Sequence, residues 1–173
     1  MASRQLLTIE EVNALKVEDF ELLFRNIIEC CPEAAQEIGL KRPFNTIVEF
    51  EKSFHNYIDN LDDIAAKEIL LKKHPQLTGK ISEDKISEES QNEQKSAGIN
   101  SLNEEYKHNL KNLNKEYEMK FAFPFVICVR ENTITTIIKE IQRRLMNNRT
   151  IELNNAIDEV KKICSLRLND LVL

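Results

Sequence analysis

The stretch that decides the fold is residues 150–171, which read TIELNNAIDEVKKICSLRLNDL. Its apolar residues recur at intervals of three and four, which is the spacing of one face of an α-helix. They are Leu153, Ile157, Val160, Cys164, Leu168 and Leu171. The pattern predicts a long helix with one side against a core.

The rest of the chain indicates more helices of the same kind. Apolar periodicity predicts a helix over 17–30. Further helices are expected over 34–40, over 102–120, which is polar and mostly exposed, and over 133–147. Helix-starting residues precede others, and they are Thr8 with Glu11 as a capping box, Asn45, Asp62 and Ser87. We expect an all-α fold, a single compact helical domain over 1–173 with about seven to nine helices.

Composition excludes several classes of protein. Lys and Arg number 24 against 29 Asp and Glu, a net charge of −5 that argues against nucleic acid as a partner. No apolar run is long enough to span a membrane, and the N-terminus lacks the apolar core of a signal peptide, so we expect an intracellular protein. The four cysteines lack zinc spacing and the three histidines are scattered, so no metal is predicted.

One segment does not fit a helical bundle. Residues 123–129 read FPFVICV, apolar and β-branched with a proline, and we refer to them as the extended segment. No second strong strand candidate exists to pair with its backbone, which must still find hydrogen-bond partners. The segment is either a plain connection that plugs the core or a binding edge for a ligand with urea-like groups.

Arg167 stands on or beside the apolar face of the last helix. A buried guanidinium needs an anionic or carbonyl partner. That partner is either the carboxylate of an anionic ligand or a structural carboxylate such as Glu93, unless the side chain reaches water from the edge of the face.

A polar helix face follows Ser87. Ser90, Glu93, Gln94 and Ala97 are spaced to share one side of that helix, which is either a hydrogen-bonding site or an ordinary solvated face. His74 ends the preceding helix, where imidazolium is favoured and a general acid would be well placed, although a lone histidine is more often structural.

Taken together, these motifs resemble the decarboxylases of 2-oxo-4-hydroxy-4-carboxy-5-ureidoimidazoline (OHCU). The resemblance covers nearly the whole chain and depends on the order and spacing of HPQLTG at 74–79, ESQNEQ at 89–94, Ala97-Gly98, FAFPFVIC at 121–128, RPF at 42–44 and KKICSLR at 161–167. Two positions depart from the family's pattern: Gln76 stands where Asp or Glu is common, and Ala122 where Gly is common.

The resemblance implies a helical enzyme, usually a homodimer, that needs no cofactor. It would release CO2 from the small-molecule substrate OHCU and form (S)-allantoin in urate degradation, in the cytoplasm or the peroxisome. The catalytic residues that it implies are His74, as acid/base, and Glu93. The substrate-binding residues, with Arg167 added from its own position, are Pro75, Ser90, Gln91, Asn92, Glu93, Gln94, Phe125, Val126, Ile127, Cys128, Val129 and Arg167.

Two other functions are compatible with parts of the sequence. A non-catalytic interaction module would explain the long polar helix over 102–120 but not the clustered motifs. A thiol hydrolase that pairs Cys128 with His74 is disfavoured, because an apolar run raises a thiol's pKa and blunts its nucleophilicity.

Overall fold

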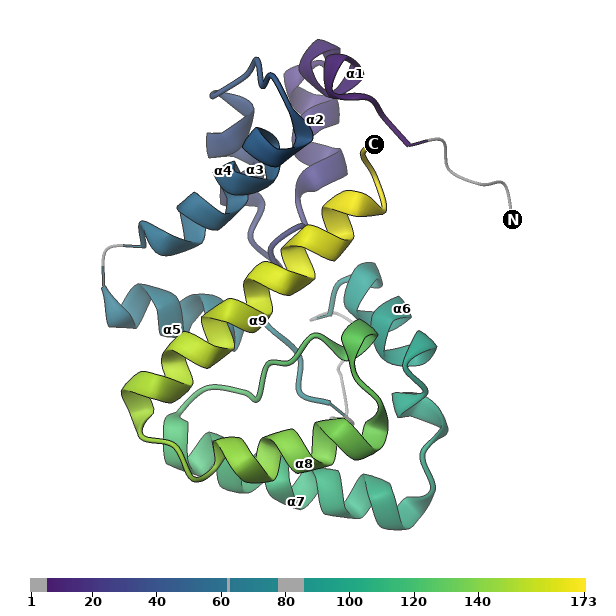
Figure 1. Cartoon of the computed structure of the whole chain (residues 1–173), viewed down its shortest axis with the longest axis vertical. Helices are drawn as coiled ribbons and strands as arrows, with labels where there is room; N and C mark the ends of the chain where they lie inside the picture. The colour runs from purple at the N-terminus through teal and green to yellow at the C-terminus, as the bar shows by residue number, and fades with distance from the viewer. Residues whose placement is uncertain (1–5, 62, 78–85) are drawn as a thin grey trace. The chain divides into compact units, whose positions relative to one another are not determined.

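The structure, a computed structural model, describes residues 6–61, 63–77 and 86–173, and Figure 1 shows that they are mainly helical. No β-sheet forms among these residues, so the predicted all-α fold is confirmed. The chain divides into two compact units, residues 1–62 with 161–173 and residues 63–160. The prediction of one domain over the whole chain stays a prediction. None of the described helices has both the length and the apolarity needed to cross a bilayer.

The first unit contains a bundle of short helices around an aromatic core. Phe20, Phe24, Phe50 and Phe54 are fully or almost fully buried, with ring centroids of adjacent pairs 4.7–5.9 Å apart. Edge-to-face contacts of this kind stabilise a core beyond the area that they bury. The helices are α1 (Ile9–Ala14), α2 (Val17–Phe24), α3 (Pro32–Gly39), α4 (Ile47–Asp59) and the end of α9 (Arg149–Asn169).

Helix boundaries in this unit partly match the sequence prediction. The capping box of Thr8 and Glu11 is confirmed. The helix expected over 17–30 ends at Phe24, and Pro32 begins α3 in the first helical position, where its missing N–H costs nothing. Thr46, not Asn45, caps α4, since its hydroxyl accepts from the Glu49 N–H at 3.1 Å.

Arg167 is buried in the first unit and has a carboxylate partner there. Its Nη1 donates to Glu29 Oε2 at 3.0 Å and to the Asn26 carbonyl at 2.7 Å. Both charged side chains are almost completely removed from water. A structural carboxylate was one of the expected partners, but it is Glu29 and not Glu93.

The second unit holds most of the residues that the sequence singled out. Asp63 caps its first helix, not Asp62, which lies outside the described residues; Ser87 caps α6 as predicted. Within this unit α7 packs against α8, and α6 packs against η3. Its elements are α5 (Ile64–Lys72), α6 (Glu88–Ser96), η2 (Ile99–Ser101), α7 (Glu104–Phe121), η3 (Val129–Glu131), α8 (Ile134–Arg144) and the first part of α9.

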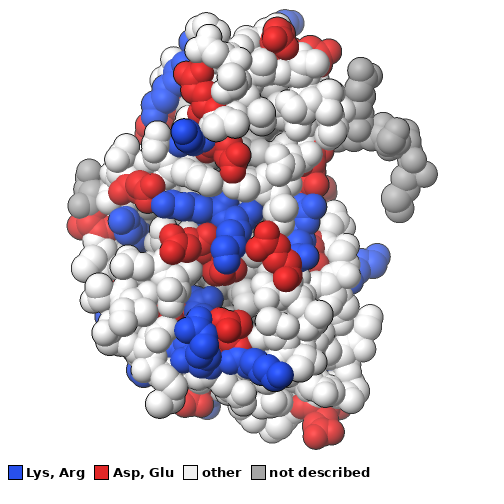
Figure 2. All heavy atoms as spheres, viewed as in Figure 1, with Lys and Arg blue, Asp and Glu red and all other residues white. Residues whose placement is uncertain are grey.

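The surface mixes charges of both signs. On the face drawn in Figure 2, Lys and Arg side chains are interspersed with Asp and Glu. Ion pairs form among the described residues, such as Arg149 with Glu68 at 2.5 Å in the second unit. Exposed pairs of this kind contribute little to stability, so the fold depends on its buried contacts.

The junction between α7 and the extended segment is a left-handed turn. Ala122 ends the helix at φ 63° and ψ 21°, and its N–H donates to the Glu118 carbonyl at 2.8 Å. A side chain with a Cβ is strained in this region, whereas glycine is not. The backbone therefore explains why glycine suits this position and why alanine there carries a cost.

We expect Ala122→Gly to stabilise the protein by about 0.5–1 kcal/mol, because relief of the strained φ outweighs the extra freedom of glycine in the unfolded chain. Chemical denaturation measures this difference. The matched control is Ala66→Gly inside α5, which should destabilise by about 1 kcal/mol. Equal losses in the two variants would contradict the assignment of strain at Ala122.

Candidate active site

His74 is held at the end of α5 by the helix itself. The side chain is 7% exposed, and Nδ1 lies 3.2 Å from the Leu70 carbonyl. A carbonyl oxygen only accepts, so Nδ1 carries a proton whenever this bond is made. Nε2 is then the ring nitrogen that can gain or lose a proton. Pro75, next in the chain, is half-buried.

Helix α6 presents a buried polar side. Ser90 and Gln94 are each 5% exposed, and Glu93 between them is half-buried. Gln91 and Asn92 lie on the exposed side of the helix. The predicted face of Ser90, Glu93, Gln94 and Ala97 is thus the inward side of α6, whereas Gln91 and Asn92, which the resemblance added, lie outside it. Helix α6 packs against η3, where the extended segment ends.

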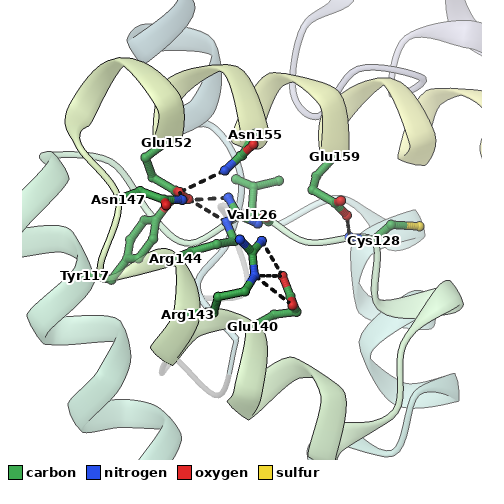
Figure 3. Close-up of polar contacts among 10 residues, drawn as sticks. All are labelled: Tyr117, Val126, Cys128, Glu140, Arg143, Arg144, Asn147, Glu152, Asn155 and Glu159. Atoms are coloured by element: carbon green, nitrogen blue, oxygen red, sulfur yellow. Dashed lines mark hydrogen bonds and ion pairs between the residues drawn. The ribbon is translucent and has the colours of Figure 1, made fainter.

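The extended segment is clamped along one edge by side chains in place of a second strand. Arg144 Nη1 donates to the Val126 carbonyl at 2.9 Å, and the Cys128 N–H donates to Glu159 Oε2 at 2.7 Å, as Figure 3 shows. Asn132 Nδ2 donates to the Cys128 carbonyl at 2.9 Å. The contacts of Arg144 and Glu159 satisfy backbone groups in the buried segment, and the Cys128 carbonyl also accepts from the Glu131 N–H at 3.2 Å.

The clamp on Val126 is part of a buried charged network. Arg144 is 2% exposed and its Nε donates to Glu152 Oε1 at 2.5 Å, while the Tyr117 hydroxyl donates to the same carboxylate (Figure 3). The Arg144 guanidinium also lies 4.6 Å from the Phe125 ring centroid. Burial is the main cause that raises the pKa of Tyr117, so its hydroxyl remains a donor.

Sequence reasoning missed Arg144, although a signal was present. Ile137, Ile141 and Arg144 are spaced by four and three on α8, and all three are buried. Arg144 is thus an arginine on an apolar helix face, the same pattern that drew attention to Arg167. Glu152 and Tyr117 gave no comparable signal.

Among the described residues, the opposite edge of the extended segment has no such partners. In extended backbone, the N–H and C=O of alternate residues point to the same edge. The backbone groups of Val126 and Cys128 point toward Arg144 and Glu159, so the backbone groups of Phe125 and Ile127 point to the other edge. No described residue makes a hydrogen bond to the backbone of Phe125 or Ile127, although both residues are buried. This edge has the N–H and C=O groups that a urea-like ligand could pair with.

The structure thus brings some of the predicted site residues together. His74, the α6 face and the extended segment all lie in the second unit, whereas Arg167 is in the first. Within the described ranges, no three His, Cys, Asp or Glu side chains are grouped so that they could hold a metal ion.

The fold is shared with two solved structures. The chain matches the crystal structure of an (S)-allantoin synthase with a TM-score of 0.75 and 19% identity, over 95% of this chain and 54% of the other. It matches the crystal structure of an OHCU decarboxylase in the presence of (S)-allantoin with a TM-score of 0.67 and 21% identity, over 89% and 96%. At these identities the similarity shows that the helical fold is shared, and it shows no more than that.

Sequence similarity is closer and identifies the family. The pattern of the OHCU decarboxylase family matches residues 13–169. The OHCU decarboxylase of Xenopus laevis is 39% identical over 95% of this chain and 94% of its own length, and that of Bos taurus 36% over 95% and 96%. The chain belongs to the OHCU decarboxylase family.

Cys128 is a poor nucleophile in this setting. Its side chain is buried, and burial is the main cause that raises the pKa of the thiol to about 11. At pH 8 only about a thousandth of it would be thiolate. A thiol-dependent reaction at neutral pH is therefore disfavoured.

We expect Cys128 of the native protein to resist iodoacetamide at pH 8, with a rate that rises about tenfold per pH unit and levels off near pH 11. Peptide mapping by mass spectrometry gives the rate, and the partly exposed Cys30 is the internal comparison. A midpoint near the ordinary thiol value of about 8.5 would show that burial does not control this group.

Proposed function

We propose that this chain catalyses the cofactor-free decarboxylation of OHCU to (S)-allantoin and CO2 in urate degradation. The observation that carries the proposal is a buried histidine with its Nδ1 bound to a helix carbonyl, in the second unit together with a polar helix face and a backbone edge to which no described residue bonds. The names of relatives similar over nearly their whole length support the same reaction.

The reaction itself requires little from the protein. The carboxylate of the substrate stands on a hydroxyl-bearing carbon beside a carbon–nitrogen double bond. When CO2 leaves, the electron pair of the broken bond forms a carbon–carbon double bond, and the pair of the carbon–nitrogen double bond moves to nitrogen, which takes up a proton. The enol that results becomes a carbonyl by losing its hydroxyl proton while a proton adds to the neighbouring carbon, which becomes the stereocentre. The enzyme has to hold the substrate, exclude water and deliver the proton to one face.

His74 is the acid/base in this proposal. Because Nδ1 donates to the Leu70 carbonyl, the ring orientation is fixed and Nε2 exchanges the proton. A proton source with one orientation favours addition to one face of the substrate, which is what an enantiospecific product requires.

Glu93 is the second catalytic residue, and it orients the substrate or the imidazole. Ser90 and Gln94, on the buried side of α6, add hydrogen bonds to the substrate, and Pro75 forms part of the wall. The resemblance also includes Gln91 and Asn92. Both lie on the exposed side of α6, and their contact with substrate stays a prediction.

The extended segment binds the ureido and ring edges of the substrate. The N–H and C=O groups of Phe125 and Ile127 form the hydrogen bonds, because the Val126 carbonyl is engaged by Arg144 and the Cys128 N–H by Glu159. The side chains of Val126, Cys128 and Val129 help to keep water out. The proposal extends to a homodimer in the cytoplasm or the peroxisome, as the family resemblance implies.

We expect His74→Asn to lower kcat by about 10²-fold or more with the fold intact, because no proton can then be delivered by the side chain. The assay generates the substrate from urate and follows allantoin by circular dichroism. In the same assay Glu93→Gln, which keeps the shape of the side chain but removes its charge, should also lose turnover. Near-normal turnover by a folded His74→Asn enzyme would remove the acid/base assignment.

The role of Arg167 in binding the substrate carboxylate stays a prediction, and within the first unit its Nη1 is engaged by Glu29 and the Asn26 carbonyl. We expect Arg167→Lys to weaken binding of allantoin, a substrate analogue, by roughly 1–3 kcal/mol in calorimetry. Glu29→Gln is the control, since it removes the carboxylate partner and keeps the guanidinium. If Arg167→Lys lowers the melting temperature but leaves the affinity of the folded protein unchanged, Arg167 has only a structural role.

A further inference from the structure

Helix α7 has one polar side chain in the middle of its buried face. Leu110, Tyr117 and Phe121 are fully buried, and Asn114 among them is 2% exposed. Its Nδ2 donates to the Leu77 carbonyl at 2.6 Å. Leu77 is three residues after His74, so this bond holds the backbone that leads away from the imidazole.

The oxygen of the Asn114 amide, Oδ1, bears on the role of this residue. The carbonyl of Leu77 can only accept, so the amide orientation is fixed and Oδ1 points elsewhere. Oδ1 is buried, and no described residue forms a hydrogen bond with it. A buried acceptor without a partner is destabilising, and this cost offsets what the bond to the Leu77 carbonyl contributes. The clearer consequence of Asn114 is positional, because its Nδ2 fixes the backbone at Leu77.

A second contact joins the same two segments one helical turn further along. Gln76 Nε2 donates to Glu118 Oε2 at 2.5 Å. This bond is exposed and contributes little to stability, but it has a direction, because the amide donates and the carboxylate accepts. Asp or Glu at position 76 would face Glu118 with a like charge. The glutamine that departs from the family's pattern thus matches its neighbour on α7.

The same helix also supports the extended segment. The ring of Tyr117, between Asn114 and Glu118, lies 5.2 Å from the Phe125 ring, and its hydroxyl donates to Glu152. Through Arg144 that carboxylate is linked to the Val126 carbonyl. One face of α7 therefore sets the places of two segments that are far apart in sequence.

We propose that Asn114 and the Gln76–Glu118 pair are positioning residues that set where His74 Nε2 lies relative to substrate on the extended segment. The inference rests on the proposed function. Proton delivery is sensitive to small displacements of the donor, and the turn after His74 is fixed to α7 by these two contacts.

The first test is a double-mutant cycle that exchanges the amide and the carboxylate of the Gln76–Glu118 pair. Gln76→Glu should lower kcat about tenfold with little change in KM, because two carboxylates then repel and displace the turn. Adding Glu118→Gln should restore kcat to within about threefold of wild type, since the pair then has its amide on α7 and its carboxylate on the turn. Glu116→Gln is the matched control, an exposed glutamate of the same helix, and should not rescue Gln76→Glu. A double variant no better than Gln76→Glu overturns the pair's role.

The second test separates positioning from plain stability. Asn114→Leu should lower kcat about tenfold while the melting temperature changes little, because the variant removes the unpartnered Oδ1 but also leaves the Leu77 carbonyl without its donor. A lower melting temperature with unchanged turnover per folded molecule overturns the role of Asn114.

A readout without substrate distinguishes the inference from the proposed function. The ¹⁵N resonances of the His74 ring in the ligand-free protein should shift in Gln76→Glu and return in the double variant with Glu118→Gln. A wild-type chain that does not turn over OHCU refutes the proposed function, yet this cycle still decides the positioning. Active wild type with no return of the His74 resonances refutes the positioning alone.

Discussion

The ion pair of Arg144 and Glu152 is the interaction on which the rest of the second unit depends. A buried backbone in extended form normally satisfies its polar groups in a sheet, and no sheet exists among the described residues. Arg144 replaces the missing strand at the Val126 carbonyl, and Glu152 keeps the arginine charge compensated away from water. Burying two charges is costly, so the pair is better explained by the geometry that it imposes than by stability.

The first unit repeats this arrangement with different partners. Arg167 joins Glu29 and the Asn26 carbonyl, as Arg144 joins Glu152 and the Val126 carbonyl. Arg144 uses two nitrogens of its guanidinium for this, Nε for the carboxylate and Nη1 for the carbonyl, whereas Arg167 makes both bonds from Nη1. In both units the arginine binds a backbone carbonyl that lies outside the described helices.

Much of the fold could be predicted from the sequence, because helix periodicity and caps are local signals. Thr8 and Ser87 were found as caps, while Thr46 and Asp63 were missed by one residue because adjacent residues can cap equally well. The motifs at His74 and along α6 could also be found from the sequence, because each is a short run of neighbouring residues. The partners Glu152, Glu159 and Asn114 were not predictable, since each meets its backbone target only after distant segments pack.

A segment that is held through its backbone atoms is tolerant of changes in its own side chains. Arg144 and Glu159 grip the carbonyl of residue 126 and the N–H of residue 128, groups that every residue but proline supplies in full. Apolar residues of similar size could therefore replace one another at these two positions during evolution without a change in the course of the backbone. Evolutionary freedom would be least at 144, 152 and 159, outside the extended segment itself.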